Sequence, residues 1–142
     1  MDRKAEARWN GGLKDGNGTV KLGSGAFDGP YSFTSRFENG TGTNPEELLG
    51  AAHAGCFSMA LGAALERGGH PATSITTKAT VHLTKGDAGF SISGIDLVTR
   101  GVVPGVSEAE FQKAAEDTKT GCIVSRALSA VPMTLDAKLG TA

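Results

Sequence analysis

The sequence predicts an α+β fold in one domain, residues 1–142, with antiparallel sheets around a long buried central helix. Three observations lead to this prediction. The chain has 142 residues, enough for one domain with a moderate core. Alternating apolar residues, typical of strands, are grouped before and after a single long apolar segment. Two segments carry helix-start signals, so the expected order is βββ-α-ββ-α(α)-β, with a short helix in parentheses.

Three short strands are expected before the long helix. Their alternating positions are Ala5, Ala7 and Trp9, then Val20 and Leu22, then Tyr31, Phe33, Ser35 and Phe37. Neighbouring side chains of a strand point to opposite faces of the sheet. We therefore expect Arg36 to point away from Phe33 and Phe37.

The central helix is predicted from about Pro45 to Arg67. Asn44 is the expected N-cap, Pro45 is suited to the first helical position, and Glu47 is placed to bond back to the cap. Two glycines follow Arg67 and end the helix. The apolar run 48–65 contains polar residues and three glycines, and two glutamates precede it, so we interpret it as a core helix rather than a membrane span. Its small residues predict a close approach of another backbone.

The second half of the chain is predicted to hold a hairpin, an amphipathic helix, a short helix and a last strand. These elements are expected at Ser74–Leu83 and Phe90–Arg100, Ser107–Gly121, Cys122–Leu128 and Val131–Leu139. The apolar phase of the second hairpin strand shifts after Ile92, which predicts a bulge near Gly94. A capping box, Ser107–Glu110, marks the start of the amphipathic helix.

Composition and charge exclude several classes of function. The 15 acidic and 14 basic residues give a net charge of −1, which argues against nucleic acid as a partner. Charges at positions 2–8 leave no apolar core for a signal peptide, so we expect a cytoplasmic protein that does not bind membranes. None of the three histidines has metal-ligand spacing to a cysteine, and no metal or cofactor is expected.

The two cysteines, Cys56 and Cys122, are the candidate chemical groups. In a reducing compartment they are expected to be reactive or plainly structural thiols rather than a permanent disulfide. Cys56 falls in the middle of the central helix, with no helix N-terminus at hand, and a buried core cysteine is the alternative. Cys122 is expected to open a short helix, and a small apolar core residue is its alternative. The absence of a Cys-x-x-Cys pair disfavours a thioredoxin-like oxidoreductase.

Several motifs resemble the osmotically inducible protein C family, the OsmC/Ohr family. The longest is residues 42–61, GTNPEELLGAAHAGCFSMAL; shorter ones are residues 31–37, 87–90, 103–105 and 121–125, in the same order and spacing. The resemblance covers nearly the whole chain. His53 before Cys56 and the arginine at position 36 resemble the osmotically inducible branch rather than the organic-hydroperoxide-resistance branch. One departure is Ile123, where members of the family often have proline.

The resemblance implies a thiol-dependent peroxidase that acts as an intertwined homodimer with two active sites at the subunit interface. The family's residues correspond to Cys56, Cys122, Arg36 and Glu46 in this sequence. Cys56 would attack an organic hydroperoxide or hydrogen peroxide and become a sulfenic acid, which Cys122 would resolve as a disulfide. The resemblance also implies an external dithiol reductant, such as lipoyl groups on a carrier protein.

Helix geometry adds a constraint on these assignments. Glu46 and Cys56 are ten residues apart, which is about 15 Å along an unbroken helix. We therefore expect Arg36 and Glu46 to serve the Cys56 of the partner subunit.

Phe57, Met59 and Phe111 are candidates to line an apolar substrate pocket, with core packing as their alternative.

The alternative function is a non-catalytic redox sensor or a small-molecule-binding scaffold on the same fold. The three histidines, His53, His70 and His82, are expected to be structural or solvated, and His53 alone merits a mutant.

Overall fold

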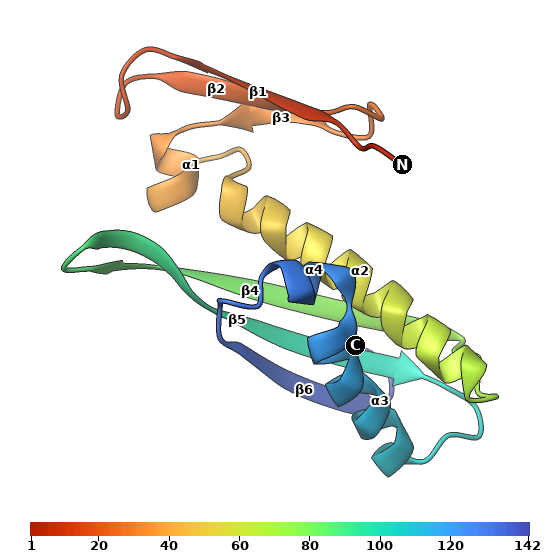
Figure 1. Cartoon of the computed structure of the whole chain (residues 1–142). Helices are drawn as coiled ribbons and strands as arrows, with labels where there is room; N and C mark the ends of the chain where they lie inside the picture. The colour runs from red at the N-terminus through yellow and green to blue at the C-terminus, as the bar shows by residue number, and fades with distance from the viewer. The chain divides into compact units, whose positions relative to one another are not determined.

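The computed structural model describes all residues, 1–142. The chain forms two compact units, Met1–Leu48 and Leu49–Ala142, and each is described by itself (Figure 1). The boundary falls within the first turns of the long helix α2 (Pro45–Arg67).

The first unit contains a three-stranded antiparallel sheet in the order β1-β2-β3. The strands are β1 (Ala5–Asn10), β2 (Asn17–Leu22) and β3 (Asp28–Tyr31). The first two strands are confirmed at the expected positions. They pair over their full length, from Ala5 opposite Leu22 to Asn10 opposite Asn17.

The expected third strand is wrong beyond Tyr31. Residues Phe33–Phe37 form a short helix, α1, instead. Ser32 is its N-cap: the Ser32 hydroxyl accepts from the amide of Ser35 at 3.1 Å, and the Ser35 hydroxyl accepts from the amide of Ser32 at 2.8 Å. This reciprocal capping box gives both backbone amides a hydrogen-bond acceptor, whereas in a strand they would need acceptors on an adjacent strand.

The side chains of α1 follow helical rather than strand geometry. Phe33 and Phe37 are four residues apart and pack with ring centroids 5.0 Å apart. The Arg36 guanidinium lies over the Phe37 ring, 5.2 Å from its centroid. The expectation that Arg36 points away from Phe37 is therefore also wrong.

Helix α2 begins and ends where the sequence predicts. The Glu47 amide donates to the Asn44 side-chain oxygen at 2.8 Å, which confirms Asn44 as the cap. The Glu47 carboxylate accepts from the Thr43 hydroxyl at 2.8 Å and not from the cap residue Asn44, so the predicted bond back to the cap is wrong. Gly69, with φ +86°, follows the last helical turn as a left-handed C-terminal residue.

The second unit is built on the sheet β4-β5-β6. The hairpin strands β4 (Ser74–Gly86) and β5 (Gly89–Val102) are antiparallel, and their register shifts between His82 and Leu83, opposite Gly94, which confirms the predicted bulge. Strand β6 (Met133–Leu139) pairs with β5 in parallel. This pairing departs from a purely antiparallel sheet because two helices, α3 (Glu108–Gly121) and α4 (Ile123–Ala127), connect β5 to β6.

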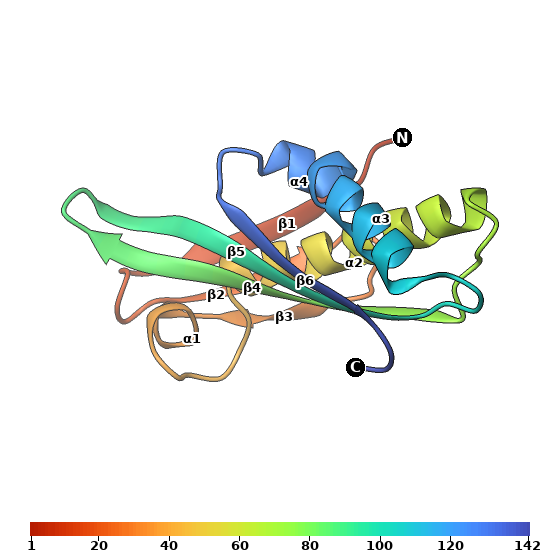
Figure 2. The same cartoon turned by 90° about the horizontal axis from the view of Figure 1, so that it is seen from below.

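The helices α2, α3 and α4 cover one face of this sheet (Figures 1 and 2). Their shared core contains Phe57, Leu61, Leu65, Ile95, Leu97, Val103, Phe111, Ala115, Cys122 and Ala137. Phe57 and Phe111 are completely buried in this core, so neither lines an open pocket, whereas Met59 is 80% exposed. Gly50 lies against β4, where an added Cβ would meet the Ala79 carbonyl at 3.5 Å, an ordinary van der Waals distance, so this contact does not require a glycine.

Helix α2 is buried on one side only within a single chain. Ala51, Ala52, Gly55 and Met59 are exposed on its other side. By length and composition α2 is apolar enough to cross a membrane, with a mean hydropathy of 1.6 over its most apolar window, and 28% of that window is buried. The core helix of a protein outside a membrane can have the same length and hydropathy.

The predicted α+β class, with two small sheets and a central helix, is confirmed.

Candidate active site

Arg36 and Glu46 form a two-pronged ion pair in the first unit. The Nη2 atom of Arg36 donates to Oε1 of Glu46 at 2.7 Å, and Nε donates to both carboxylate oxygens at 3.2 and 3.3 Å. The Arg36 side chain is 38% exposed, whereas that of Glu46 is 8% exposed. A bidentate contact of this kind fixes the plane of the guanidinium and leaves its outer edge free to donate.

Local hydrogen bonds hold α1 against the start of α2. The Ser35 hydroxyl donates to the Thr43 carbonyl at 2.7 Å, and the Asn44 side-chain amide donates to the Ser35 carbonyl at 3.0 Å. These contacts place Arg36, in the last turn of α1, opposite Glu46, in the first turn of α2. The pair is therefore positioned by a segment of only fifteen consecutive residues, 32–46.

An aromatic hollow of about 250 Å³ opens beside the guanidinium. It is lined by Trp9, Leu13, Tyr31, Ser32, Phe33, Arg36 and Phe37. Trp9 and Tyr31 pack with ring centroids 5.3 Å apart. The hollow thus combines one cation with an otherwise largely apolar wall, which suits a small molecule with an apolar body and a polar end.

Both thiols lie at the first turn of α4 in the second unit. The Val124 amide donates to the sulfur of Cys56 at 3.5 Å, and the Ser125 amide donates to the sulfur of Cys122 at 3.3 Å. Cys56 is partly buried, Cys122 is buried, and both are free thiols. The sequence placed no helix N-terminus near Cys56; the structure supplies that of α4 from a segment 68 residues further along the chain.

Cys122 ends one helix and begins the next. It has extended backbone angles, φ −65° and ψ 147°, between α3 and α4. Its amide donates to the Thr118 carbonyl of α3 at 2.9 Å, and its carbonyl accepts from the Arg126 amide at 3.0 Å. The sulfur of Cys122 takes the place that a serine or threonine oxygen usually takes at an N-cap, which confirms that Cys122 opens a short helix.

Two further polar side chains, Ser125 and His53, form a hydrogen-bonded chain with Cys122, and neither was among the predicted site residues. The Cys122 thiol donates to the Ser125 hydroxyl at 3.1 Å, and that hydroxyl lies 2.7 Å from Nε2 of His53. Burial lowers the pKa of His53, whose side chain has no exposed surface. The spacing Cys-x-x-Ser at 122–125, which is that of a capping box, was the signal available for Ser125.

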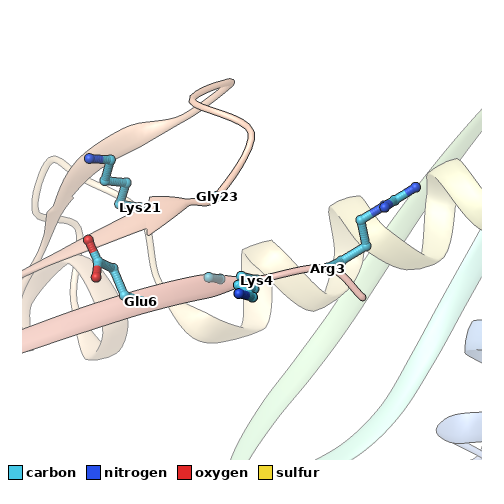
Figure 3. A pocket seen from close by; sticks show the side chains of 6 residues that line it. Arg3, Lys4, Glu6, Lys21 and Gly23 are labelled. Atoms are coloured by element: carbon cyan, nitrogen blue, oxygen red, sulfur yellow. The ribbon is translucent and has the colours of Figure 1, made fainter. Parts of the chain in front are cut away.

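A separate surface hollow lies along β1 and β2. It measures about 630 Å³ and is lined by Arg3, Lys4, Ala5, Glu6, Lys21 and Gly23. Glu6 and Lys21 are cross-strand partners, and Arg3 points away from them (Figure 3). No group of three or more His, Cys, Asp and Glu side chains that could hold a metal ion is present in the structure. The hollow contains neither of the two thiols and is not the candidate site.

The structure thus brings the four predicted site residues together as two pairs. Arg36 and Glu46 meet in the first unit, and Cys56 and Cys122 meet at α4 in the second. The catalytic roles assigned to all four stay predictions.

Comparison with known proteins gives consistent matches. The family described as OsmC-like protein matches residues 38–136. Peroxiredoxin OsmC of Escherichia coli is 49% identical over 140 residues, covering 98% of this chain and 97% of the relative, and the protein of the same name from Shigella flexneri matches equally.

Solved structures agree with this assignment. The organic hydroperoxide resistance protein OhrB of Bacillus subtilis is 25% identical, with a TM-score of 0.74 over 95% of this chain and 98% of that one. An OsmC-like protein from Mycoplasma pneumoniae, 16% identical, has the same fold with a TM-score of 0.77 over 99% of both chains. With a family match over most of its length and a curated relative that shares 49% of the aligned residues, this chain belongs to the OsmC-like protein family.

Proposed function

We propose that this protein is a thiol-dependent peroxidase in which Cys56 reduces a hydroperoxide and Cys122 resolves the product. The observation that carries the proposal is the meeting of both free thiols at the first turn of α4, although they are 66 residues apart in sequence. The name of the 49% identical relative, Peroxiredoxin OsmC, supports the reaction class.

The chemistry divides into three steps. The Cys56 thiolate attacks one peroxide oxygen, the O–O bond breaks, and the departing alkoxide takes a proton to become an alcohol. Cys56 is then a sulfenic acid, and attack by Cys122 forms the Cys56–Cys122 disulfide and releases water. An external dithiol reduces this disulfide by thiol exchange, and lipoyl groups on a carrier protein are the reductant implied by family resemblance.

The backbone amides at α4 support the first two steps. A hydrogen bond from an amide to sulfur is stronger when the sulfur carries negative charge, because the bond is then charge-assisted. The Val124 amide points at Cys56 and the Ser125 amide at Cys122. Each sulfur is therefore met by a donor suited to the thiolate that its step requires.

Arg36 is the proposed stabiliser of the oxygen that leaves with the negative charge. Its guanidinium is oriented by Glu46 and borders the aromatic hollow, so a bound hydroperoxide would place its O–O bond near the cation and its alkyl group against the rings. An organic hydroperoxide fills such a hollow better than hydrogen peroxide does. We therefore expect organic hydroperoxides to be the preferred substrates.

A homodimer is proposed because one chain's helix separates Glu46 from Cys56. Ten residues of α2 correspond to about 15 Å. Arg36 and Glu46 would then serve Cys56 of the partner subunit. The exposed apolar side of α2, with Ala51, Ala52, Gly55 and Met59, is the surface that a second copy would cover.

The test is peroxide consumption by the purified protein with tert-butyl hydroperoxide or hydrogen peroxide and dihydrolipoamide as reductant. We expect Cys56→Ser to abolish turnover and Cys122→Ser to lose activity over successive cycles, because its sulfenic acid oxidises further. Ala130→Ser, at an exposed position, is the matched control. Turnover that does not depend on Cys56 would refute the proposal, and oxidation without turnover by several dithiols would favour a redox sensor.

A further inference from the structure

A buried chain of hydrogen bonds leads from the Cys122 thiol into the core. The thiol donates to the Ser125 hydroxyl at 3.1 Å, and this hydroxyl lies 2.7 Å from Nε2 of His53. Cys122 and Ser125 are each 3% exposed, and His53 is not exposed at all. The three groups belong to the start of α4 and to α2, 72 residues apart between His53 and Ser125.

The chemical state of His53 matches a proton acceptor. Ser125 is its only hydrogen-bond partner, Nδ1 is buried without a partner, and no carboxylate or cation forms an ion pair with it. Burial without a counter-charge lowers the pKa of His53 and keeps the imidazole neutral. With its proton on Nδ1, the neutral ring leaves Nε2 free to accept from Ser125.

Core packing alone does not account for this arrangement. A buried imidazole with one unpaired nitrogen is costly, and an apolar side chain of similar size would fill the same space without that cost. A histidine and a serine in line with a thiol form the same type of relay by which a base receives the proton of a nucleophile.

We propose that Ser125 and His53 relay the proton of Cys122 when this thiol attacks oxidised Cys56. Ser125 touches the reacting sulfur, and His53 acts through Ser125 as a positioning and proton-accepting residue. The inference deepens the proposed peroxidase function and rests on it. It concerns the resolving step only, since neither residue is hydrogen-bonded to the sulfur of Cys56 through its side chain.

The step balances in atoms and electrons. The Cys122 sulfur attacks the Cys56 sulfur, the S–S bond forms, and the S–O bond breaks to release hydroxide. The thiol proton passes to the Ser125 oxygen while the Ser125 hydroxyl proton passes to Nε2 of His53. His53 then returns its proton through Ser125 to the hollow of about 310 Å³ that Ser125 lines with Lys119 and Thr120, and this proton converts the released hydroxide to water. The net products are the disulfide and one water molecule.

The decisive variant is His53→Gln. The glutamine amide can still hydrogen-bond Ser125, but it cannot take up a proton at neutral pH. A single equivalent of tert-butyl hydroperoxide oxidises Cys56, and rapid-quench mass spectrometry then follows the sulfenic acid and the disulfide separately. We expect the rate of sulfenic acid formation in His53→Gln to stay within about twofold of that in the unmodified protein. The rate of disulfide formation at pH 7 should fall by about thirtyfold, because an ordinary thiol without a base is only a few per cent ionised there.

Two further readouts separate a relay from a structural role. The His53→Gln defect should shrink by about tenfold per pH unit between pH 7 and 8, because a thiol ionises without help as the pH rises. Ser125→Ala should slow disulfide formation by a similar factor, and the double variant should be no slower than either single variant, because both belong to one chain. His82→Gln is the control: His82 is exposed and pairs with Asp96 at 2.7 Å.

Each outcome decides the inference. Wild-type rates of disulfide formation in His53→Gln refute the relay and leave the peroxidase function standing. Slow sulfenic acid formation in His53→Gln refutes the restriction to the resolving step. If His53→Gln does not fold, which circular dichroism reveals, Ser125→Ala decides by the same measurement. If the unmodified protein forms no Cys56–Cys122 disulfide with peroxide, the proposed function fails, and the relay fails with it.

Discussion

The Arg36–Glu46 pair and the His53–Ser125–Cys122 chain differ in charge and in exposure. The pair consists of two full charges, and Arg36 keeps 38% of its side chain exposed, so a substrate can reach it from solvent. The chain contains no full charge and is buried throughout. The difference fits the two proposed roles. The charge of Arg36 stabilises a developing anion directly, whereas the buried chain carries a charge only during proton transfer.

The two clusters also differ in how the sequence assembles them. Arg36 and Glu46 are ten residues apart, and the caps of α1 and α2 position them locally. His53 and Ser125 are 72 residues apart, and only the packing of α4 against α2 brings them together. We therefore expect capping variants to affect the first cluster and core variants to affect the second.

The largest effect is expected from Arg36. Arg36→Ala should lower kcat/KM for tert-butyl hydroperoxide by about 10²- to 10³-fold, the usual cost of removing a donor to a developing oxyanion. Arg36→Lys should recover only part of this loss, since an ammonium has no planar fork for Glu46. Stopped-flow measurement of Cys56 oxidation checks the prediction. Equal rates in Arg36→Ala and the unmodified protein would show that the charged cluster has no part in the peroxide step.

Glu46 should have a smaller effect than Arg36. Glu46→Gln keeps the shape of the side chain but removes the carboxylate that accepts from Nε and Nη2 of Arg36, so we expect kcat/KM to fall by about 10- to 100-fold through misplacement of the guanidinium. Glu66→Gln, at an exposed position of the same helix, is the matched control and should retain full activity. A loss confined to thermal stability would assign Glu46 a structural role only.

His53 should make stability depend on pH in the direction opposite to that of an ion-paired histidine. Its folded-state pKa is lowered by burial, so below about pH 6.5, the usual histidine value, the unfolded chain binds a proton that the folded chain does not. The free energy of unfolding should therefore fall as pH decreases from 6.5, by at most about 1.4 kcal/mol per pH unit from this group. Urea titrations of the unmodified protein and His53→Gln between pH 5 and 7.5 measure the difference.

That comparison has a clear opposite outcome. If the two proteins lose stability in parallel over this range, other groups carry the dependence, and the neutral state assigned to His53 in the relay loses its thermodynamic support.

The sequence predicted the elements whose signals are long or specific. The cap at Asn44, the capping box at Ser107 and the hairpin bulge near Gly94 were all confirmed, because each rests on a backbone requirement that few residue types meet. The contact of Cys56 with the Val124 amide of α4 was not predictable from periodicity, since no local pattern encodes which distant turn packs against the middle of α2. The same holds for the contact between His53 and Ser125.

The segment after Tyr31 shows why a short apolar pattern misleads. Phe33 and Phe37 fit a strand with period two and also fit a helix with spacing i, i+4, and five residues are too few to separate these alternatives. Ser32 decided the outcome, because its hydroxyl and that of Ser35 satisfy each other's amides and no partner strand is needed. The usual capping box has Glu or Gln at the position of Ser35, so the signal was present in a weaker form.

The smallest predicted effect tests this local origin of the Arg36 site. Ser32→Ala removes the cap of α1 and should cost about 1 kcal/mol of local stability, seen as faster amide hydrogen exchange in residues 33–38. Because α1 carries Arg36, kcat/KM should fall a few-fold while disulfide formation at Cys122 keeps its rate. Ser129→Ala, at an exposed position of the second unit, is the control. A slower resolving step in Ser32→Ala would show that the two clusters are coupled, whereas an effect confined to peroxide attack would establish them as independently positioned.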